Sequence, residues 1–220
     1  MDKHRELKAL ATKRQRARWP GYKGIGDYHN GVYECPYVSP YTKTAGNVDA
    51  NIMVVLQDWT SDEDIRRDVD SDSVTYGYTR ALHTNRNLVR LLEEHFDTAL
   101  TDIYGTNLFP FIKMGHMGSN IPRRDLVRAA REFALPQITI VRPKLVICLG
   151  LATFNALREA CDHEPVYPIA AAIRSPFNLG ATRIWCQAHT GARGQNNRNS
   201  GVKRVPDDWR CMKRDLSAKA

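Results

Sequence analysis

Three polar residues whose side chains could do chemistry stand at or near the ends of apolar stretches of this sequence. Asp58 and His189 each directly follow an apolar stretch, and Asn107 lies near the end of another. A carboxylate can activate water, an amide can read the edge of a nucleic-acid base, and an imidazole can donate a hydrogen bond to a leaving group. Each residue also has a structural explanation, since Asp58 can cap a helix, Asn107 can close a turn and His189 can be a satisfied core histidine. Their position relative to one another decides between these interpretations.

Four stretches rich in apolar residues predict the strands that would carry these side chains. They are residues 51–57, 99–108, 145–149 and 183–188. Continuous apolar runs are typical of parallel strands, because helices cover both faces of the sheet. Ligands of such sheets bind at the carboxyl ends of the strands, so we expect Asp58, Asn107 and His189 to converge on one rim.

Apolar residues at helical spacing predict helices between these strands. The expected helices are a basic helix at 3–18, a helix capped by Thr84 with its apolar face on Leu88, Leu91, Leu92 and Phe96, a helix from Arg123 to about Val141, one at 152–160 after a tight turn at Gly150, and a basic helix at 207–217. Residues 20–50 have no period and predict a long ordered loop that covers a site. The alternation predicts an α/β fold with three layers, a central four-stranded parallel sheet flanked by helices, in a single domain over residues 1–220.

The positive charge of the chain is concentrated at its two ends. The 220 residues carry a formal net charge of +8, and residues 1–18 and 189–220 each carry +5. Basic segments of this kind suit a polyanion such as nucleic acid, although solvated helix faces would give the same composition.

Composition also limits the class of protein. No apolar run is long enough to cross a bilayer, and the charged N-terminus does not resemble a secretory signal. The five cysteines include no CxxC pair, which predicts free thiols in a reducing compartment. The histidines have no metal-ligand spacing. We therefore expect a cytoplasmic monomer without membrane contact, metal or cofactor.

Four segments, in order along the chain, resemble motifs of the uracil-DNA glycosylase superfamily. Gln57-Asp58 matches two positions of the motif Gly-Gln-Asp-Pro-Tyr, and Thr106-Asn107 is similar to the Thr-Asn motif of the family 4 enzymes. Residues 142–152 are similar to the strand and turn Pro-x-hydrophobic-Leu-Gly-x-Ala, and residues 188–191 to the His-Pro-Ser motif. The resemblance covers residues 51 to about 198.

The resemblance implies a role for each matching residue. Asp58 would activate or position the attacking water, and His189 would stabilise the charge on the leaving base. The residues that it implies for base binding, together with aromatic candidates for stacking, are Gln57, Asn107, Trp59, Tyr78 and Phe111, with Tyr76 as a further stacking candidate. Those that it implies for DNA contact are Gly191, Ala192, Arg193, Arg198, Lys203 and Arg204.

The chain departs from the superfamily at defined positions. Leu56 and Trp59 replace the Gly and Pro of the first motif, and Thr190-Gly191 replaces Pro-Ser. The cysteines that hold an iron–sulfur cluster in family 4 are missing, so no cluster is expected. The function implied is that of a monofunctional DNA glycosylase that hydrolyses the N-glycosidic bond of uracil or another deaminated base. Two alternatives are a nucleic-acid-binding member of the fold with altered catalysis, and an unrelated α/β hydrolytic enzyme for a nucleoside-like substrate.

Overall fold

The computed structural model describes residues 2–217 and has an α/β fold, as predicted. Its central sheet has five strands in the order β2-β1-β3-β5-β4. Their bounds are Ile52–Leu56 for β1, Tyr104–Asn107 for β2, Leu145–Leu149 for β3, Phe177–Leu179 for β4 and Thr182–Gln187 for β5. The first four strands in this order are parallel, and only β4 runs antiparallel, at the edge. The carboxyl ends of β1, β2 and β5 therefore lie along one side of the sheet.

The edge strand is the difference from the predicted four-stranded sheet. Strand β4 has three residues, of which only Phe177 is buried, so it leaves no apolar run in the sequence. It joins β5 through a tight turn in which Gly180 has a φ of +57°, a conformation that glycine adopts at little cost. By contrast, every residue of β1 and β3 is buried, which explains why both strands appear in the sequence as continuous apolar runs.

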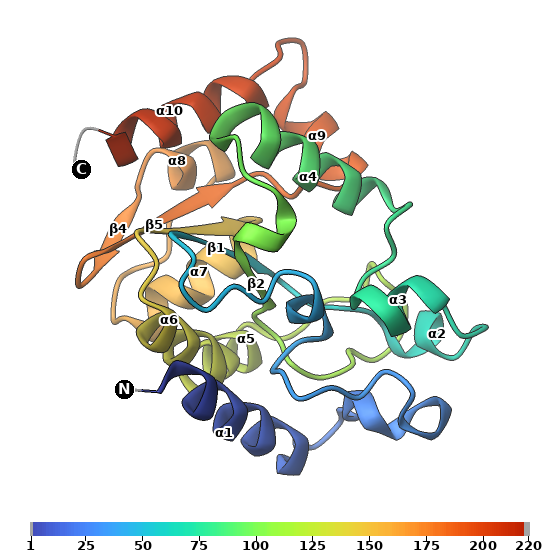
Figure 1. Ribbon diagram of the computed structural model, residues 1–220. Helices are drawn as coiled ribbons and strands as arrows, with labels where there is room; N and C mark the ends of the chain where they lie inside the picture. The colour runs from blue at the N-terminus through green and yellow to red at the C-terminus, as the bar shows by residue number, and fades with distance from the viewer. Residues whose placement is uncertain (1, 218–220) are drawn as a thin grey trace.

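Ten α-helices surround the sheet within the described residues. They are α1 (Lys3–Arg16), α2 (Asp62–Ile65), α3 (Ser71–Tyr76), α4 (His83–Phe96), α5 (Arg123–Ala129), α6 (Leu135–Val141), α7 (Leu151–Ala160), α8 (Ile169–Ile173), α9 (Ala192–Arg198) and α10 (Val205–Ser217). Figure 1 shows α4 and α10 packed together on one side of the sheet, and α1, α5 and α6 on the other. No helix in the described part of the chain is long and apolar enough to cross a membrane.

The long helix expected from Arg123 to about Val141 is interrupted by a π-helical turn over Ala130–Ala134. Pro136 explains the interruption, because proline has no N–H to donate to the carbonyl of Glu132 and its ring crowds that carbonyl. The Nζ of Lys13 donates to the Glu132 carbonyl oxygen at 3.3 Å. Helix α1 is thus tied to α5–α6 at the point where the helical hydrogen bonding is disturbed.

Local hydrogen bonding changes three other boundaries. Thr84 lies within the first turn of α4, so it does not cap the helix from outside, and the N-cap residue is Leu82. Residues Leu100–Asp102 form a 3-10 turn, so the predicted strand at 99–108 begins only at Tyr104. The acidic segment after β1 folds into α2 and α3, whose N-cap side chains, Ser61 and Asp70, accept backbone hydrogen bonds.

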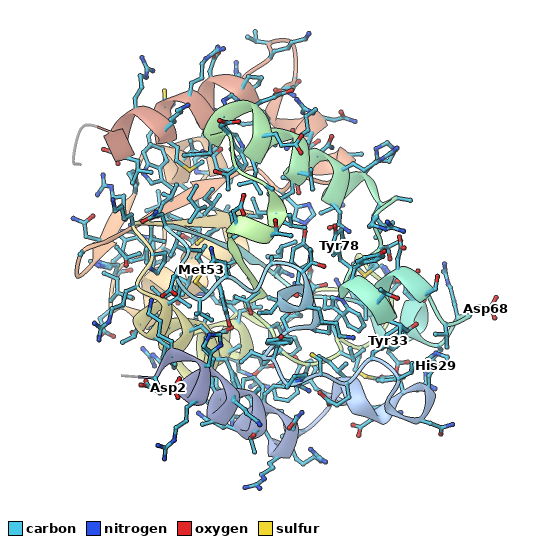
Figure 2. The ribbon with its side chains drawn as sticks, in the orientation of Figure 1. Asp2, His29, Tyr33, Met53, Asp68 and Tyr78 are labelled. Carbon is cyan, nitrogen blue, oxygen red and sulfur yellow. The ribbon has the colours of Figure 1, made fainter. Side chains whose placement is uncertain are left out.

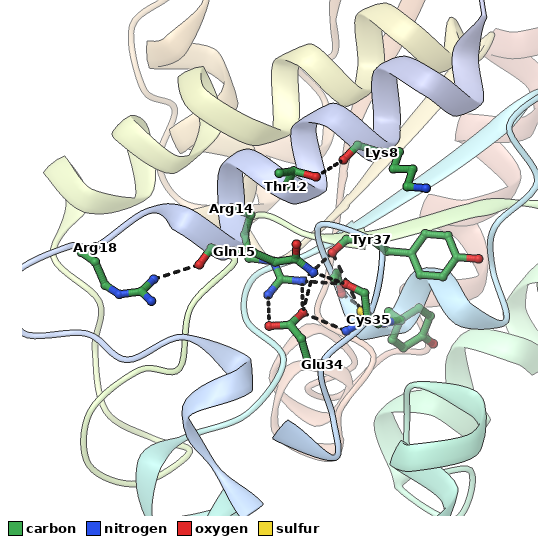
Figure 3. Close-up of polar contacts among 10 residues, drawn as sticks. Lys8, Thr12, Arg14, Gln15, Arg18, Glu34, Cys35 and Tyr37 are labelled. Carbon is green, nitrogen blue, oxygen red and sulfur yellow. Dashed lines mark hydrogen bonds and ion pairs between the residues drawn. The ribbon is translucent and has the colours of Figure 1, made fainter. Parts of the chain in front are cut away.

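The predicted loop over residues 20–50 contains three short 3-10 turns and is tied to α1 by a buried arginine. Arg14 is 1% exposed, and its guanidinium donates to both carboxylate oxygens of Glu34 at 2.8 and 2.6 Å (Figure 3). It also donates to the carbonyl oxygens of Cys35 and Tyr37 at 3.1 and 2.7 Å. Burial acts to raise the pKa of Glu34, but the hydrogen bonds and charge of Arg14 outweigh it and lower that pKa. This loop then lies against β2, where the hydroxyl of Ser39 donates to Asn107 and that of Thr42 donates to the carbonyl oxygen of Gly105.

Candidate functional site

One cavity of about 520 Å³ is lined by Asp58, Asn107 and His189 together. Asp58 follows β1, Asn107 ends β2, and His189 follows β5, so residues far apart in the chain meet at the carboxyl edge of the sheet. The register of the sheet brings this about, because Leu56 of β1 pairs directly with Asn107 of β2. Such cavities are the usual place for a ligand in an α/β sheet.

The carboxylate of Asp58 is held on both oxygens. Gln57 Nε2 donates to Oδ1 at 2.9 Å, and Lys113 Nζ lies 2.9 Å from Oδ2. The side chain of Asp58 is 7% exposed and that of Lys113 is 4% exposed, so both charges line the cavity and are largely shielded from solvent. The pair fixes where the carboxylate points.

Lys113, which lies in the segment after β2, was not predicted from the sequence as a site residue. Its backbone carbonyl accepts from the N–H of Asp62 at 2.8 Å, and it forms an isolated bridge with Ser61. Its Nζ donates to the carbonyl oxygen of Met117. The signal that could have found it is a lone lysine directly after the apolar residues Phe109–Ile112. A lysine in such a place is seldom buried without a partner.

Asn107 is 1% exposed and its amide is held by Ser39. The Ser39 hydroxyl accepts from the N–H of Tyr41 at 3.1 Å and donates to Oδ1 of Asn107 at 2.5 Å. In this arrangement Oδ1 accepts from Ser39, and the donor Nδ2 lies on the other branch of the amide. Ser39 belongs to the long loop that was expected to cover a site.

The hydrogen bonding of His189 defines its tautomer. The N–H of Gly191 donates to Nδ1 at 3.0 Å, so the proton of the neutral ring is on Nε2. The residue as a whole is exposed, but its ring lines the cavity, and the loss of solvent around the ring lowers its pKa. The charge of Asp58 acts to raise this pKa, and that of Lys113 acts to lower it. The lowered pKa favours the neutral ring, which presents a hydrogen-bond donor at Nε2.

The glycines after His189 allow α9 to lie close to it. A Cβ on Gly194 would stand 2.3 Å from the carbonyl oxygen of His189, a distance that no side chain tolerates. Gln195 Nε2 donates to the same carbonyl at 3.1 Å. The glycine pattern therefore serves to hold the histidine loop against the first turn of α9.

The predicted aromatic residues separate into two groups. Trp59 and Tyr78 line the cavity, where Trp59 Nε1 donates to the carbonyl of Gly77 at 2.8 Å. Figure 2 shows Tyr78 and Tyr33, another lining residue, in the same part of the molecule. Phe111 does not line the cavity: it is 2% exposed, and its ring centre lies 4.9 Å from that of Trp19 in the core. Tyr76 also lies outside the lining, with Arg80 over its ring.

The predicted DNA-contacting cations also differ in their availability. Arg193, Lys203 and Arg204 are exposed, in α9 and the segment before α10, and Gly191 and Ala192 begin α9. Arg198 is 10% exposed and donates to both carboxylate oxygens of Asp208 at 2.6 and 2.8 Å. It joins α9 to α10 and is not open to a phosphate group. Arg193, Lys203 and Arg204 remain the candidates.

The outer part of the cavity is acidic. Asp64, Asp68 and Asp70 line it, and Asp68 lies at the far edge of the molecule in Figure 2. Burial acts to raise the pKa of Asp70, but hydrogen bonds from Thr79 and Ser73 outweigh it and lower that pKa. Among the described residues, no three His, Cys, Asp or Glu side chains come together as a metal site.

The chain matches no protein-family model and no curated protein. The function of the cavity therefore has to be inferred from its own geometry: an ion-paired carboxylate, an amide of defined orientation and a neutral imidazole donor, surrounded by aromatic rings.

Proposed function

We propose that this protein removes a base from DNA by hydrolysing its N-glycosidic bond, with uracil or another deaminated base as substrate. The observation that carries the proposal is the convergence of Asp58, Asn107 and His189 in one cavity of about 520 Å³. Because the glycosidic bond is inaccessible within a duplex, the nucleotide has to be flipped into this cavity. Trp59 and Tyr78 offer apolar ring surface to a flipped base.

Asp58 faces the sugar in this proposal. Cleavage of the glycosidic bond develops positive charge on the sugar, which a fixed carboxylate stabilises without having to reorient. The same carboxylate can position or deprotonate the attacking water. Gln57 and Lys113 hold the two oxygens in place and so pre-organise the group.

Asn107 and His189 act on the base. The Nδ2 donor of Asn107 suits the O4 carbonyl of uracil, whereas cytosine presents an amino group at that position. The Nε2–H of neutral His189 suits a carbonyl oxygen that gains negative charge as the base leaves. These two donors together favour a base with carbonyl groups at both positions.

The distribution of charge suggests where the DNA backbone runs. Exposed cations occur at Arg193, Lys203 and Arg204, after His189, whereas aspartates are among the residues that line the cavity itself. Phosphate groups would be attracted to the first region and repelled by the second. We therefore place the backbone along α9 and the segment before α10.

Base release from synthetic oligonucleotides tests the proposal. Single- and double-stranded DNA containing uracil, hypoxanthine or xanthine would be incubated with the protein, and abasic sites would be detected by strand scission in hot alkali. We expect release from at least one substrate, and its loss in Asp58→Asn. The exposed Asp49→Asn variant, 80% exposed in the side chain, is the matched control. If no substrate yields abasic sites with the wild-type protein, the proposal is wrong.

A second candidate function follows from the aspartates that line the outer part of the cavity. Asp64, Asp68 and Asp70 make the outer cavity a poor place for phosphate, which favours an uncharged nucleoside over a polynucleotide. Under this alternative the same Asp58, Asn107 and His189 release a base from free nucleosides. Chromatography of nucleoside reactions separates the two: base release from nucleosides but not from DNA would support this second candidate.

A further inference from the structure

We propose that Lys113 gives the cavity a second activity, in which its amine forms an imine with the aldehyde of an abasic site and the DNA strand is then cut by β-elimination. This inference rests on the proposed function in one respect, namely that the sugar lies beside Asp58. It adds a covalent step and a strand-cutting product that simple hydrolysis of the glycosidic bond does not have.

The position of the amine carries the inference. Lys113 Nζ lies 2.9 Å from Asp58 Oδ2, and both side chains line the cavity. A sugar carbon that is held against Oδ2 of Asp58 would therefore lie close to Nζ. Lysine amines are the protein nucleophiles that form imines with carbonyl carbons, and a neighbouring base activates them by removing a proton. Asp58 is such a base, already in contact.

The chain holds this amine firmly. Its Nζ donates to the carbonyl of Met117, and its own backbone carbonyl accepts from Asp62 at 2.8 Å. If the residue served only as a counter-ion, an arginine would serve as well or better, since its guanidinium pairs with both carboxylate oxygens at once. The property that lysine has and arginine lacks is a nucleophilic amine.

Each step of the reaction balances with water as the only other reactant. The ammonium of Lys113 passes a proton to Asp58, and its nitrogen attacks C1′ of the ring-opened abasic sugar to form a C–N bond. The carbonyl oxygen takes up protons and leaves as water, which gives a protonated imine and regenerates the Asp58 carboxylate. The carboxylate then removes a proton from C2′, and the electron pair expels the 3′ phosphate from C3′ as its anion. Water finally hydrolyses the imine and frees Lys113.

His189 is not the base in this sequence. Its Nδ1 accepts from Gly191 and its Nε2 carries the proton, so the neutral ring has no free nitrogen to take up the C2′ proton. Asp58 is thus assigned the removal of a proton both from the Lys113 ammonium and from C2′.

Borohydride trapping on DNA that already contains an abasic site tests the inference separately from base release. The full chain would be mixed with abasic-site duplex in the presence of sodium borohydride, which reduces an imine to a stable amine. We expect a covalent protein–DNA complex and, without borohydride, a strand cut on the 3′ side of the site. Digestion of the wild-type complex and mass spectrometry should place the sugar adduct on Lys113.

Two variants complete the test. Lys113→Arg keeps the positive charge beside Asp58 but has no nucleophilic amine, so trapping should fall by at least about 100-fold. Lys8→Arg, a change at an exposed lysine of α1, should trap as the wild type does. Circular dichroism establishes that both variants are folded.

The outcomes are distinct for the two proposals. Absence of a wild-type complex with abasic DNA, an adduct on another lysine, or full trapping by Lys113→Arg would each overturn the role of Lys113. Trapping on Lys113 without release of any base from intact DNA would leave this inference standing and overturn the proposed base excision.

Discussion

Two ion pairs of this protein each have a buried cation and a short contact, and they differ in what surrounds them. Arg14 and Glu34 approach to 2.6 Å, and Lys113 and Asp58 to 2.9 Å, and the cationic side chains are 1% and 4% exposed. Arg14 donates hydrogen bonds to the carboxylate of Glu34 and to the backbone carbonyls of Cys35 and Tyr37. This pair joins α1 to the long loop over residues 20–50. The Lys113 pair lines a cavity at the carboxyl ends of the strands.

The difference indicates what each pair is for. Taking two charges out of water costs several kcal/mol per ion, so a buried pair is often no more stabilising than apolar residues of the same size. For Arg14 the cost is offset by a bidentate contact and by hydrogen bonds to the carbonyl groups of Cys35 and Tyr37. The Lys113–Asp58 pair instead lines a cavity at the carboxyl ends of the strands, which points to a pair kept for chemistry.

The largest expected effect is on activity, at Asp58. Asp58→Asn should lower the rate of base release by roughly 100- to 10,000-fold, because an amide neither stabilises the sugar cation nor accepts a proton from water. The measurement is single-turnover release from uracil-containing DNA, with rates corrected for the folded fraction. Stability should fall as well, since Lys113 loses its counter-ion, but the protein should remain folded. If Asp58→Asn released the base at the wild-type rate, the Lys113–Asp58 pair would have no catalytic role and would not differ in function from the Arg14–Glu34 pair.

The next effect is on stability, at Arg14. Arg14→Met should lower the free energy of unfolding by about 3 kcal/mol, because it leaves the partly buried Glu34 carboxylate without its counter-ion and removes the hydrogen bonds to two carbonyls. Urea unfolding measures the change, with Arg16→Met on the exposed side of the same helix as the matched control. Base release per folded molecule should stay at the wild-type level. Loss of activity without loss of stability would contradict the structural role.

The pH dependence of stability sharpens the comparison further. The pKa of Glu34 is lowered in the folded protein, mainly by Arg14 against the opposing effect of burial. The stabilisation that Glu34 provides is therefore complete above the unfolded pKa of about 4.3 and is lost as the pH falls through the lowered, folded value. Glu34→Gln lacks this contribution, so its deficit in unfolding free energy should shrink as the pH falls below about 4.3.

Urea titrations in steps from neutral to acid pH would follow this deficit. The exposed Glu93→Gln variant reports the effect of removing a negative charge elsewhere. A deficit for Glu34→Gln that stays constant across the acid range would contradict the assignment of the Arg14 pair.

The convergence of Asp58, Asn107 and His189 was predictable because it follows from topology. Apolar strands of a parallel sheet are recognisable in a sequence, and residues that follow them must lie on one side of it. Strand β3 is the clearest case, since all five residues of Leu145–Leu149 are buried and its bounds agree with the prediction. Helix α1 was recognisable in the same way, from its thin apolar stripe.

The partners of these residues were not predictable, because they come from segments without a period. Lys113 and Ser39 lie in irregular stretches. A backbone contact with Asp62 places Lys113, and a side-chain hydrogen bond to Asn107 holds Ser39. Phe111 illustrates the opposite error: an aromatic residue near a strand end can point into the core, and the sequence does not say which way it faces. Helices α2 and α3 depend on side-chain caps rather than on apolar spacing, which hid them as well.

The smallest expected effect concerns specificity, at Ser39. The Ser39 hydroxyl holds Oδ1 of Asn107, which leaves Nδ2 as the donor for a base carbonyl. Without the hydroxyl the amide is free to turn over and to present its oxygen to the amino group of cytosine instead. Ser39→Ala should therefore lower the preference for uracil over cytosine by about tenfold, which corresponds to about 1.4 kcal/mol. Competition between the two substrates in one reaction measures this ratio, and Ser39→Thr, which keeps a hydroxyl, should restore most of it. An unchanged ratio in Ser39→Ala would mean that Asn107 is oriented by its other surroundings, and that the cavity holds its carboxylate more firmly than its amide.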